Sequence, residues 1–128
     1  MNSCELDARL TRDLKLLNIP IDEVDLFIRP FSVTYFGRYF PSADDNVRPR
    51  VFLYPYSDKE GNMYPYRDIL LTLIHEMVHH IQHTNCSFVR LKGVMHDTNF
   101  WKLYNRYVSK AEKYKLIGGE TCEKKISC

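Results

Sequence analysis

The sequence predicts an α+β fold in which helices pack on a small antiparallel sheet of three strands. Apolar residues recur at helical spacing near the N-terminus and again through the second half of the chain. Between these regions, β-branched and aromatic residues gather in three short segments. With 128 residues, of which 45% are hydrophobic and 27% charged, the chain has the length and composition of one globular domain.

The first predicted helix covers residues 4–18, and Pro20 closes the segment because proline cannot continue a helix. One face of this helix is apolar and consists of Leu6, Leu10, Leu14 and Leu17. Three strands are expected next, at residues 24–29, 32–40 and 51–56. In the third, Pro55 places the end of the strand at a sheet edge, since proline cannot donate a hydrogen bond to a central ladder.

Two further helices complete the predicted fold. The first covers residues 66–84 and has an apolar arc formed by Leu70, Leu73, Ile74, Met77, Val78 and Ile81. The last covers residues 98–116, with Asp97 as its N-cap and Gly118-Gly119 as its end. Its predicted buried face consists of Phe100, Tyr104, Tyr107, Val108 and Ala111. We therefore expect one domain at residues 1–117 and a short tail at 118–128.

Charge and composition exclude several classes of protein. The 18 basic and 16 acidic residues give a net charge of +2, which by itself does not indicate a nucleic-acid partner. No apolar run reaches the length of a membrane span, and the first residues lack the apolar stretch of a signal peptide. We expect a cytoplasmic monomer whose four cysteines are free thiols, because they form no CxxC pair; they are Cys4, Cys86, Cys122 and Cys128.

The segment that points to chemistry is His75-Glu76-Met77-Val78-His79, an HExxH motif inside the predicted helix 66–84. A helix turns by about 100° per residue, so His79 lies about 40° from His75 and one turn along. Both imidazoles can therefore bind one metal ion. Glu76 is displaced from the pair but near enough to act on a water at the metal. The apolar arc lies on the opposite side of the helix.

Two histidines leave zinc short of the three protein ligands that catalytic sites use. The metzincin pattern HExxHxxGxxH is excluded, because Gln82 and Asn85 stand where it requires Gly and His. Glu112 or Glu120 would suit a gluzincin. His96 is the better-placed candidate, since it lies just before the last helix, where a turn can bring it over the motif.

The motif and the segment after it resemble the SprT-like, or Spartan-type, zinc metallopeptidase domain. That family has HExxH followed by HGxxF at the opening of the next helix, and residues 96–101 of this chain read HDTNFW. Asp97 stands in place of the family's Gly. Residues 35–39 and 51–54 also look like the sheet region of the family, and the resemblance covers most of residues 5–116.

The resemblance implies a zincin-like fold and a zinc-dependent endopeptidase. Its metal would be Zn²⁺, with Glu76 as the general base and His75, His79 and His96 as the ligands. Some members act on proteins crosslinked to DNA, which implies DNA-associated substrates. The zinc-ribbon tail of many members is reduced here to Cys122 and Cys128, which cannot complete a four-ligand site by themselves.

Other residues have weaker signals. His83 shares the face of the two motif histidines and either lines the cleft or lies on the surface, whereas His80 is expected to be exposed. Candidate donors to a developing oxyanion are Tyr54, Tyr56 and Tyr64. The last helix carries a basic stripe that is either a solvated face or a DNA contact; it consists of Lys102, Arg106, Lys110, Lys113 and Lys115.

The predicted function is hydrolysis of a peptide bond by a metal-activated water. We expect the polypeptide substrate to pair with an edge strand at residues 51–56 by β-augmentation. Two alternatives stay open at this point. One is a zinc-stabilised module that binds DNA or protein without turnover, and the other is a zinc hydrolase that acts on a non-peptide bond.

Overall fold

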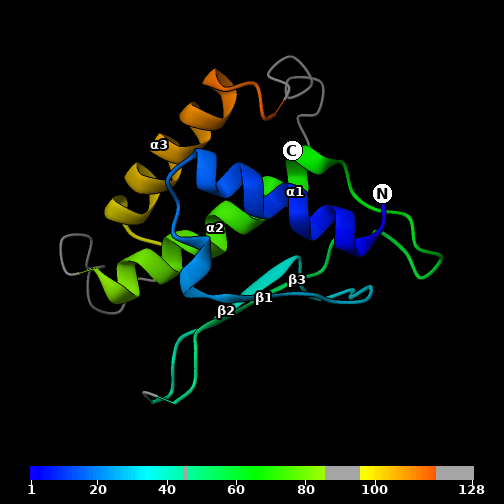
Figure 1. Cartoon of the computed structure of the whole chain (residues 1–128), viewed down its shortest axis with the longest axis horizontal. Helices are drawn as coiled ribbons and strands as arrows, with labels where there is room; N and C mark the ends of the chain where they lie inside the picture. Colours follow the sequence, from blue (N-terminus) through cyan, green and yellow to red (C-terminus); the bar gives the residue numbers. More distant parts are fainter. Residues whose placement is uncertain (45, 86–95, 118–128) are drawn as a thin grey trace.

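The computed structural model describes residues 1–44, 46–85 and 96–117, and these form an α+β fold (Figure 1). The helices lie on one side of a three-stranded sheet. In chain order the elements are α1 (Ser3–Leu16), the 3-10 turn η1 (Ile21–Glu23), β1 (Asp25–Ile28), β2 (Gly37–Phe40), β3 (Arg50–Leu53), α2 (Tyr66–Thr84) and α3 (Thr98–Lys113). The bounds of α2 are those that the sequence predicts.

Helices α1 and α3 end earlier than predicted, and both end in the same way. Asn18 has a φ of 61° and Lys115 a φ of 59°, so each adopts the left-handed conformation that stops a helix. The next amide N–H then donates back across the last turn, from Ile19 to the carbonyl of Leu14 and from Leu116 to that of Ala111. Helix α3 is therefore closed at Lys113, before the Gly118-Gly119 pair that was expected to end it.

The sheet is mixed, which corrects the prediction of an antiparallel sheet. Its strand order is β1-β3-β2, so β3 is the central strand. Strand β2 runs antiparallel to β3, whereas β1 runs parallel to it, with Asp25 opposite Arg50 and Ile28 opposite Leu53. The chain leaves β1, passes to the far edge to form β2, and returns between the two as β3. Two reversals of direction make β1 and β3 parallel.

The prediction of a sheet edge at Pro55 was also wrong. The ladder of β3 ends at Leu53, so Pro55 lies beyond the strand and removes no ladder hydrogen bond. Its carbonyl instead accepts a hydrogen bond from the amide of Tyr64. The edge strands are β1 and β2, and of these β2 packs against α2.

The core lies between the helices and the inner face of the sheet. The predicted apolar arc of α2 is confirmed, because each of its six residues is at most 6% exposed. The four leucines predicted for the inner face of α1 are also fully buried. Val51 and Leu53 of β3 point into this core, while Arg50 and Phe52 alternate with them toward the outer face. Among the described residues, no helix is long and apolar enough to cross a membrane.

We predict that Leu73→Asp unfolds the protein. Leu73 is 0% exposed, and an unpaired carboxylate at this position would cost roughly 5 kcal/mol or more. That cost approaches the whole stability of a domain, about 5–15 kcal/mol. The matched control is Leu16→Asp, because Leu16 is 51% exposed and surface changes shift stability by about 0.5 kcal/mol. Thermal unfolding followed by circular dichroism compares the two, and equal melting temperatures would contradict the helical phase of α2.

Candidate metal centre

Three histidines from two elements meet at one point. His75 and His79 lie one turn apart on α2, and His96 lies in the turn just before α3. Their ligand atoms are all within 4.8 Å of one another, and the Nε2 atoms of His79 and His96 are 3.1 Å apart. The structure thus brings together the three predicted ligands, and the cluster could hold one metal ion. Within residues 1–44, 46–85 and 96–117, no other group of three His, Cys, Asp or Glu side chains converges in this way.

Phe100 supports the cluster from the first turn of α3. Its ring is fully buried, and its centroid lies 4.8 Å from those of His75 and His79 and 4.7 Å from that of His96. A single rigid ring therefore contacts all three imidazoles and limits how far each can rotate.

Asp97 fixes the turn that carries His96. Its carboxylate accepts a hydrogen bond from the amide of Phe100 at 2.8 Å, which confirms it as the N-cap of α3. The same oxygen accepts a second hydrogen bond, at 3.2 Å, from the side-chain amide of Gln82 on α2. Asp97 has a φ of −82°, which any residue adopts, so an Asp in place of the Gly of the SprT-like pattern strains nothing here.

The electrostatic surroundings keep His75 neutral. Burial lowers its pKa to about 4, and the nearby His96 acts in the same direction. An imidazole that is neutral at pH 7 has a free lone pair for a metal ion. The site therefore favours the ligand form of His75 over the imidazolium form.

Glu76 lies in a tight contact between α2 and β2. It is 8% exposed, and burial raises the pKa of its carboxyl group to about 7, with Arg38 partly opposing the shift. A Cβ atom on Gly37 would lie 3.1 Å from the Cγ of Glu76 and 2.8 Å from the Cγ2 of Thr72. Only glycine lets β2 approach α2 this closely. Gly37 has no predicted role from the sequence, although an isolated glycine in a strand often marks such an approach.

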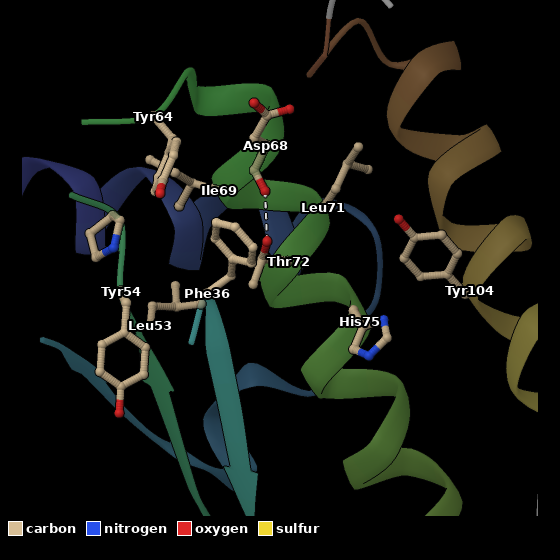
Figure 2. A pocket seen from close by; sticks show the side chains of 11 residues that line it. Phe36, Leu53, Tyr54, Tyr64, Asp68, Ile69, Leu71, Thr72, His75 and Tyr104 are labelled. Atoms are coloured by element: carbon tan, nitrogen blue, oxygen red, sulfur yellow. Dashed lines mark hydrogen bonds between the residues drawn. The ribbon is translucent and has the colours of Figure 1, made fainter. Parts of the chain in front are cut away.

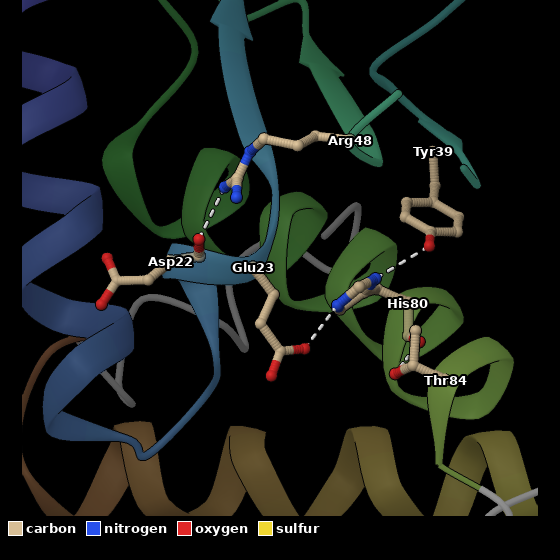
Figure 3. Close-up of polar contacts among 6 residues, drawn as sticks. All are labelled: Asp22, Glu23, Tyr39, Arg48, His80 and Thr84. Carbon is tan, nitrogen blue, oxygen red and sulfur yellow. Dashed lines mark hydrogen bonds and ion pairs between the residues drawn. The ribbon is translucent and has the colours of Figure 1, made fainter. Parts of the chain in front are cut away.

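His80 is buried and hydrogen-bonded, contrary to the prediction that it is exposed (Figure 3). Its Nε2 lies 2.8 Å from a carboxylate oxygen of Glu23, and its Nδ1 lies 2.8 Å from the hydroxyl of Tyr39. Since the carboxylate only accepts, Nε2–H donates to Glu23, and in the neutral imidazole Nδ1 then accepts from the Tyr39 hydroxyl. Burial and the charge of Glu23 raise the pKa of Tyr39 to about 12, so this hydroxyl keeps its proton.

The error over His80 has a plain physical cause. Helical spacing shows which side of α2 is apolar, but it does not show what packs on the remaining sides. Here η1 supplies Glu23 and β2 supplies Tyr39, and together they cover a side of the helix that the sequence leaves polar. The hydrogen bonds of His80 therefore join three elements next to His79.

A groove of about 670 Å³ runs between β2 and the three histidines. Tyr35, Gly37 and Tyr39 line it from the strand side, and the three histidines and Glu76 line it from the other. His83 also lines the groove and is exposed, so it both borders the cleft and lies on the surface, the two positions that the sequence left open. The strand beside the cluster is thus β2, and no other described strand pairs with its outer edge. This corrects the prediction for residues 51–56, because β3 is already paired on both sides.

Of the two alternative ligands, the one that the structure describes does not join the cluster. Glu112 is exposed on α3, away from the three histidines, and Glu120 lies outside the described residues. Cys4 is a free, exposed thiol as predicted. Cys86, Cys122 and Cys128 lie outside the described residues.

The predicted oxyanion donors Tyr54, Tyr56 and Tyr64 do not all lie near the histidine cluster, and the basic stripe on α3 is not entirely exposed. Tyr54 and Tyr64 line a second pocket, which His75 borders, whereas Tyr56 pairs with Met63 in an isolated bridge. Lys110 does not face solvent freely, because its ammonium group donates to the carbonyl of Leu17 at 3.1 Å and so ties α3 to α1. The other four members of the stripe are exposed; they are Lys102, Arg106, Lys113 and Lys115.

Comparison with known proteins adds no assignment: no model of a protein family matches this chain, and no curated protein matches it. What the site can do must therefore be inferred from its residues and their geometry.

We predict that His96→Ala weakens zinc binding by at least about 100-fold, since even the loss of a residue that only supports a ligand costs roughly 10–100-fold. His96 is exposed, so the fold should survive. The matched control is His83→Ala, which removes a groove histidine outside the cluster. Zinc titration against a chelator of known affinity measures the effect. Full zinc affinity in His96→Ala would show that the third ligand is another residue.

We also predict that His80→Ala lowers the free energy of unfolding by about 2–4 kcal/mol. The change removes two hydrogen bonds, leaves a cavity and strands the Tyr39 hydroxyl without its acceptor. Urea denaturation measures this, again with His83→Ala for comparison. Equal stabilities for the two variants would contradict the buried position of His80.

Proposed function

We propose that the protein is a zinc-dependent endopeptidase of the SprT-like type. The observation that carries this proposal is the position of Glu76 beside three convergent histidines, in a groove bordered by an edge strand. A general base, a metal-ligand set and a strand that can pair with a peptide are the parts that peptide hydrolysis needs.

Zinc fits the donor set of this site. With zinc–nitrogen bonds of about 2.0–2.1 Å and tetrahedral angles, two ligand nitrogens lie roughly 3.3 Å apart. The 3.1 Å between the Nε2 atoms of His79 and His96 is close to that value. Three imidazoles and one open position make up a ligand set known from catalytic zinc sites. His75, His79 and His96 would hold the ion.

The residues around the metal have distinct roles in the proposed reaction. When bound, zinc supplies a Lewis acid that activates water and polarises a carbonyl group. The Glu76 carboxylate accepts a proton from the attacking water and then delivers a proton to the leaving amine. The close approach of Gly37 confines the Glu76 side chain on one side, so its carboxylate needs little reorganisation during the reaction.

Strand β2 offers a docking edge for the substrate. Its outer edge has no strand partner among the described residues, and the groove lies directly beside it. An extended polypeptide that pairs with β2 would pass across the metal ligands, because Gly37 is close to Glu76. DNA-associated proteins are substrates that only the SprT-like resemblance suggests.

We predict that Glu76→Gln keeps the fold and the bound zinc but lowers peptide hydrolysis by about 10²–10⁴-fold, the usual contribution of a general base. Gln has nearly the shape of Glu, so it fits beneath Gly37, but its amide accepts no proton. Zinc content and turnover of a casein or peptide substrate should be measured on the same sample.

The matched control for this variant is Glu60→Gln, at an exposed glutamate in the loop before α2. This control should retain full turnover. Unchanged turnover in zinc-loaded Glu76→Gln would remove Glu76 from the mechanism. If the zinc-loaded wild type cleaves no polypeptide, the protein is a zinc-stabilised binding module or a hydrolase of another bond.

A further inference from the structure

A second pocket of about 410 Å³ borders the metal cluster at His75, the residue that also lines the groove (Figure 2). We infer that this pocket, here called the apolar pocket, receives an aromatic or large aliphatic side chain of the polypeptide, next to the bond that is cleaved. The inference rests on the proposed function and adds a substrate preference to it.

The walls of the apolar pocket come from four parts of the chain. Phe36 precedes β2, Tyr54 follows β3, Leu71 belongs to α2 and Tyr104 belongs to α3. Figure 2 shows these side chains around the space beside His75. Tyr64 packs its ring edge-to-face with that of Phe36 at 5.5 Å, which makes a stiff aromatic wall. A volume of this size is near the lower end of the range for ligand pockets, about 300–1,000 Å³.

The chemistry of the lining favours an apolar occupant. Among the described lining residues, Asp68 is the one with a carboxylate, and His75 is neutral because burial lowers its pKa to about 4. Figure 2 shows the Asp68 carboxylate pointing away from the ring of Phe36. Thr72 lines the pocket too, but its hydroxyl is already used, because it donates to the backbone carbonyl of Asp68 at 2.9 Å. A charged side chain would lose its water here with little compensation.

The position of the pocket relative to β2 makes it a side-chain subsite. Phe36 immediately precedes β2, so a peptide paired with this strand passes the mouth of the pocket. Successive side chains of an extended peptide point to opposite faces. One side chain of the peptide therefore enters the apolar pocket while its neighbours point away. Because His75 belongs to both the pocket and the histidine cluster, the peptide residue in the pocket lies beside the metal site.

Binding can be tested without any catalytic activity. Methyl NMR of the whole protein should show shifts of the Ile69 and Leu71 signals on titration with N-acetylphenylalaninamide. The corresponding lysine and alanine amides should bind at least about tenfold more weakly. Equal binding of all three, or tighter binding of the lysine amide through Asp68, would overturn the inference.

Specificity is tested on peptides that differ at one position. Replacing Phe by Ala or Lys beside the cleaved bond should lower kcat/KM by about 10–100-fold. The variant Phe36→Ala should remove most of this preference, and its fold should persist because Phe36 is 62% exposed. The matched control Phe27→Ala, at an exposed phenylalanine of β1 that does not line the pocket, should retain it.

The outcomes separate this inference from the proposed function. Cleavage of the Phe, Ala and Lys peptides at equal rates overturns the substrate preference and leaves the endopeptidase standing. Selective binding of the phenylalanine amide without cleavage of any peptide does the reverse: it supports the pocket and overturns the proposed activity.

Discussion

Helix α2 buries ten of its nineteen residues, and the rest of the molecule is arranged around that constraint. The sheet and α3 both pack against it, and its apolar arc forms the centre of the core. The strip that carries His75 and His79 is left half-buried, neither sealed in the core nor fully in solvent. A metal-ligand set needs this intermediate environment, because ligands must be held rigidly while one side stays open to a substrate.

Two polar side chains that α2 buries, His80 and Gln82, form hydrogen bonds with other elements, whereas the side-chain oxygen of Gln82 has no partner among the described residues. His80 is satisfied by Tyr39 and Glu23, and Gln82 donates to Asp97. These hydrogen bonds connect α2 to β2, to η1 and to the turn before α3, and two of the residues that form them, Tyr39 and Gln82, line the groove. Buried polar contacts of this kind specify one arrangement of the packed elements, since breaking one leaves an unpaired group. The site is thus braced by hydrogen bonds as well as by apolar packing.

The sequence predicted those features that depend on residues close together in the chain. Apolar periodicity gave the bounds of α2 and its buried arc, and the motif spacing identified His75 and His79. The position of His96 just before the last helix made it the best placed of three candidates for the third histidine or carboxylate in the cluster. The pairing order of the strands was not predictable, because a strand's sequence does not say which neighbour it meets. The burial of His80 and the contact of Gly37 with Glu76 could not be predicted from the sequence for the same reason, because both depend on how β2 packs against α2. The predictions failed where the partner comes from a distant part of the chain.

The division of the three histidines between two elements links metal binding to folding. His79 and His96 are 17 residues apart, and their imidazoles meet only when α3 is docked on α2. An ion held by both histidines binds the folded chain and not the unfolded one, so its binding free energy adds to the stability of the fold. At a free concentration one thousand times its Kd, such an ion contributes about 4 kcal/mol. In a domain this small, a bound metal ion would hold α2 and the start of α3 together, in addition to any role in the proposed reaction.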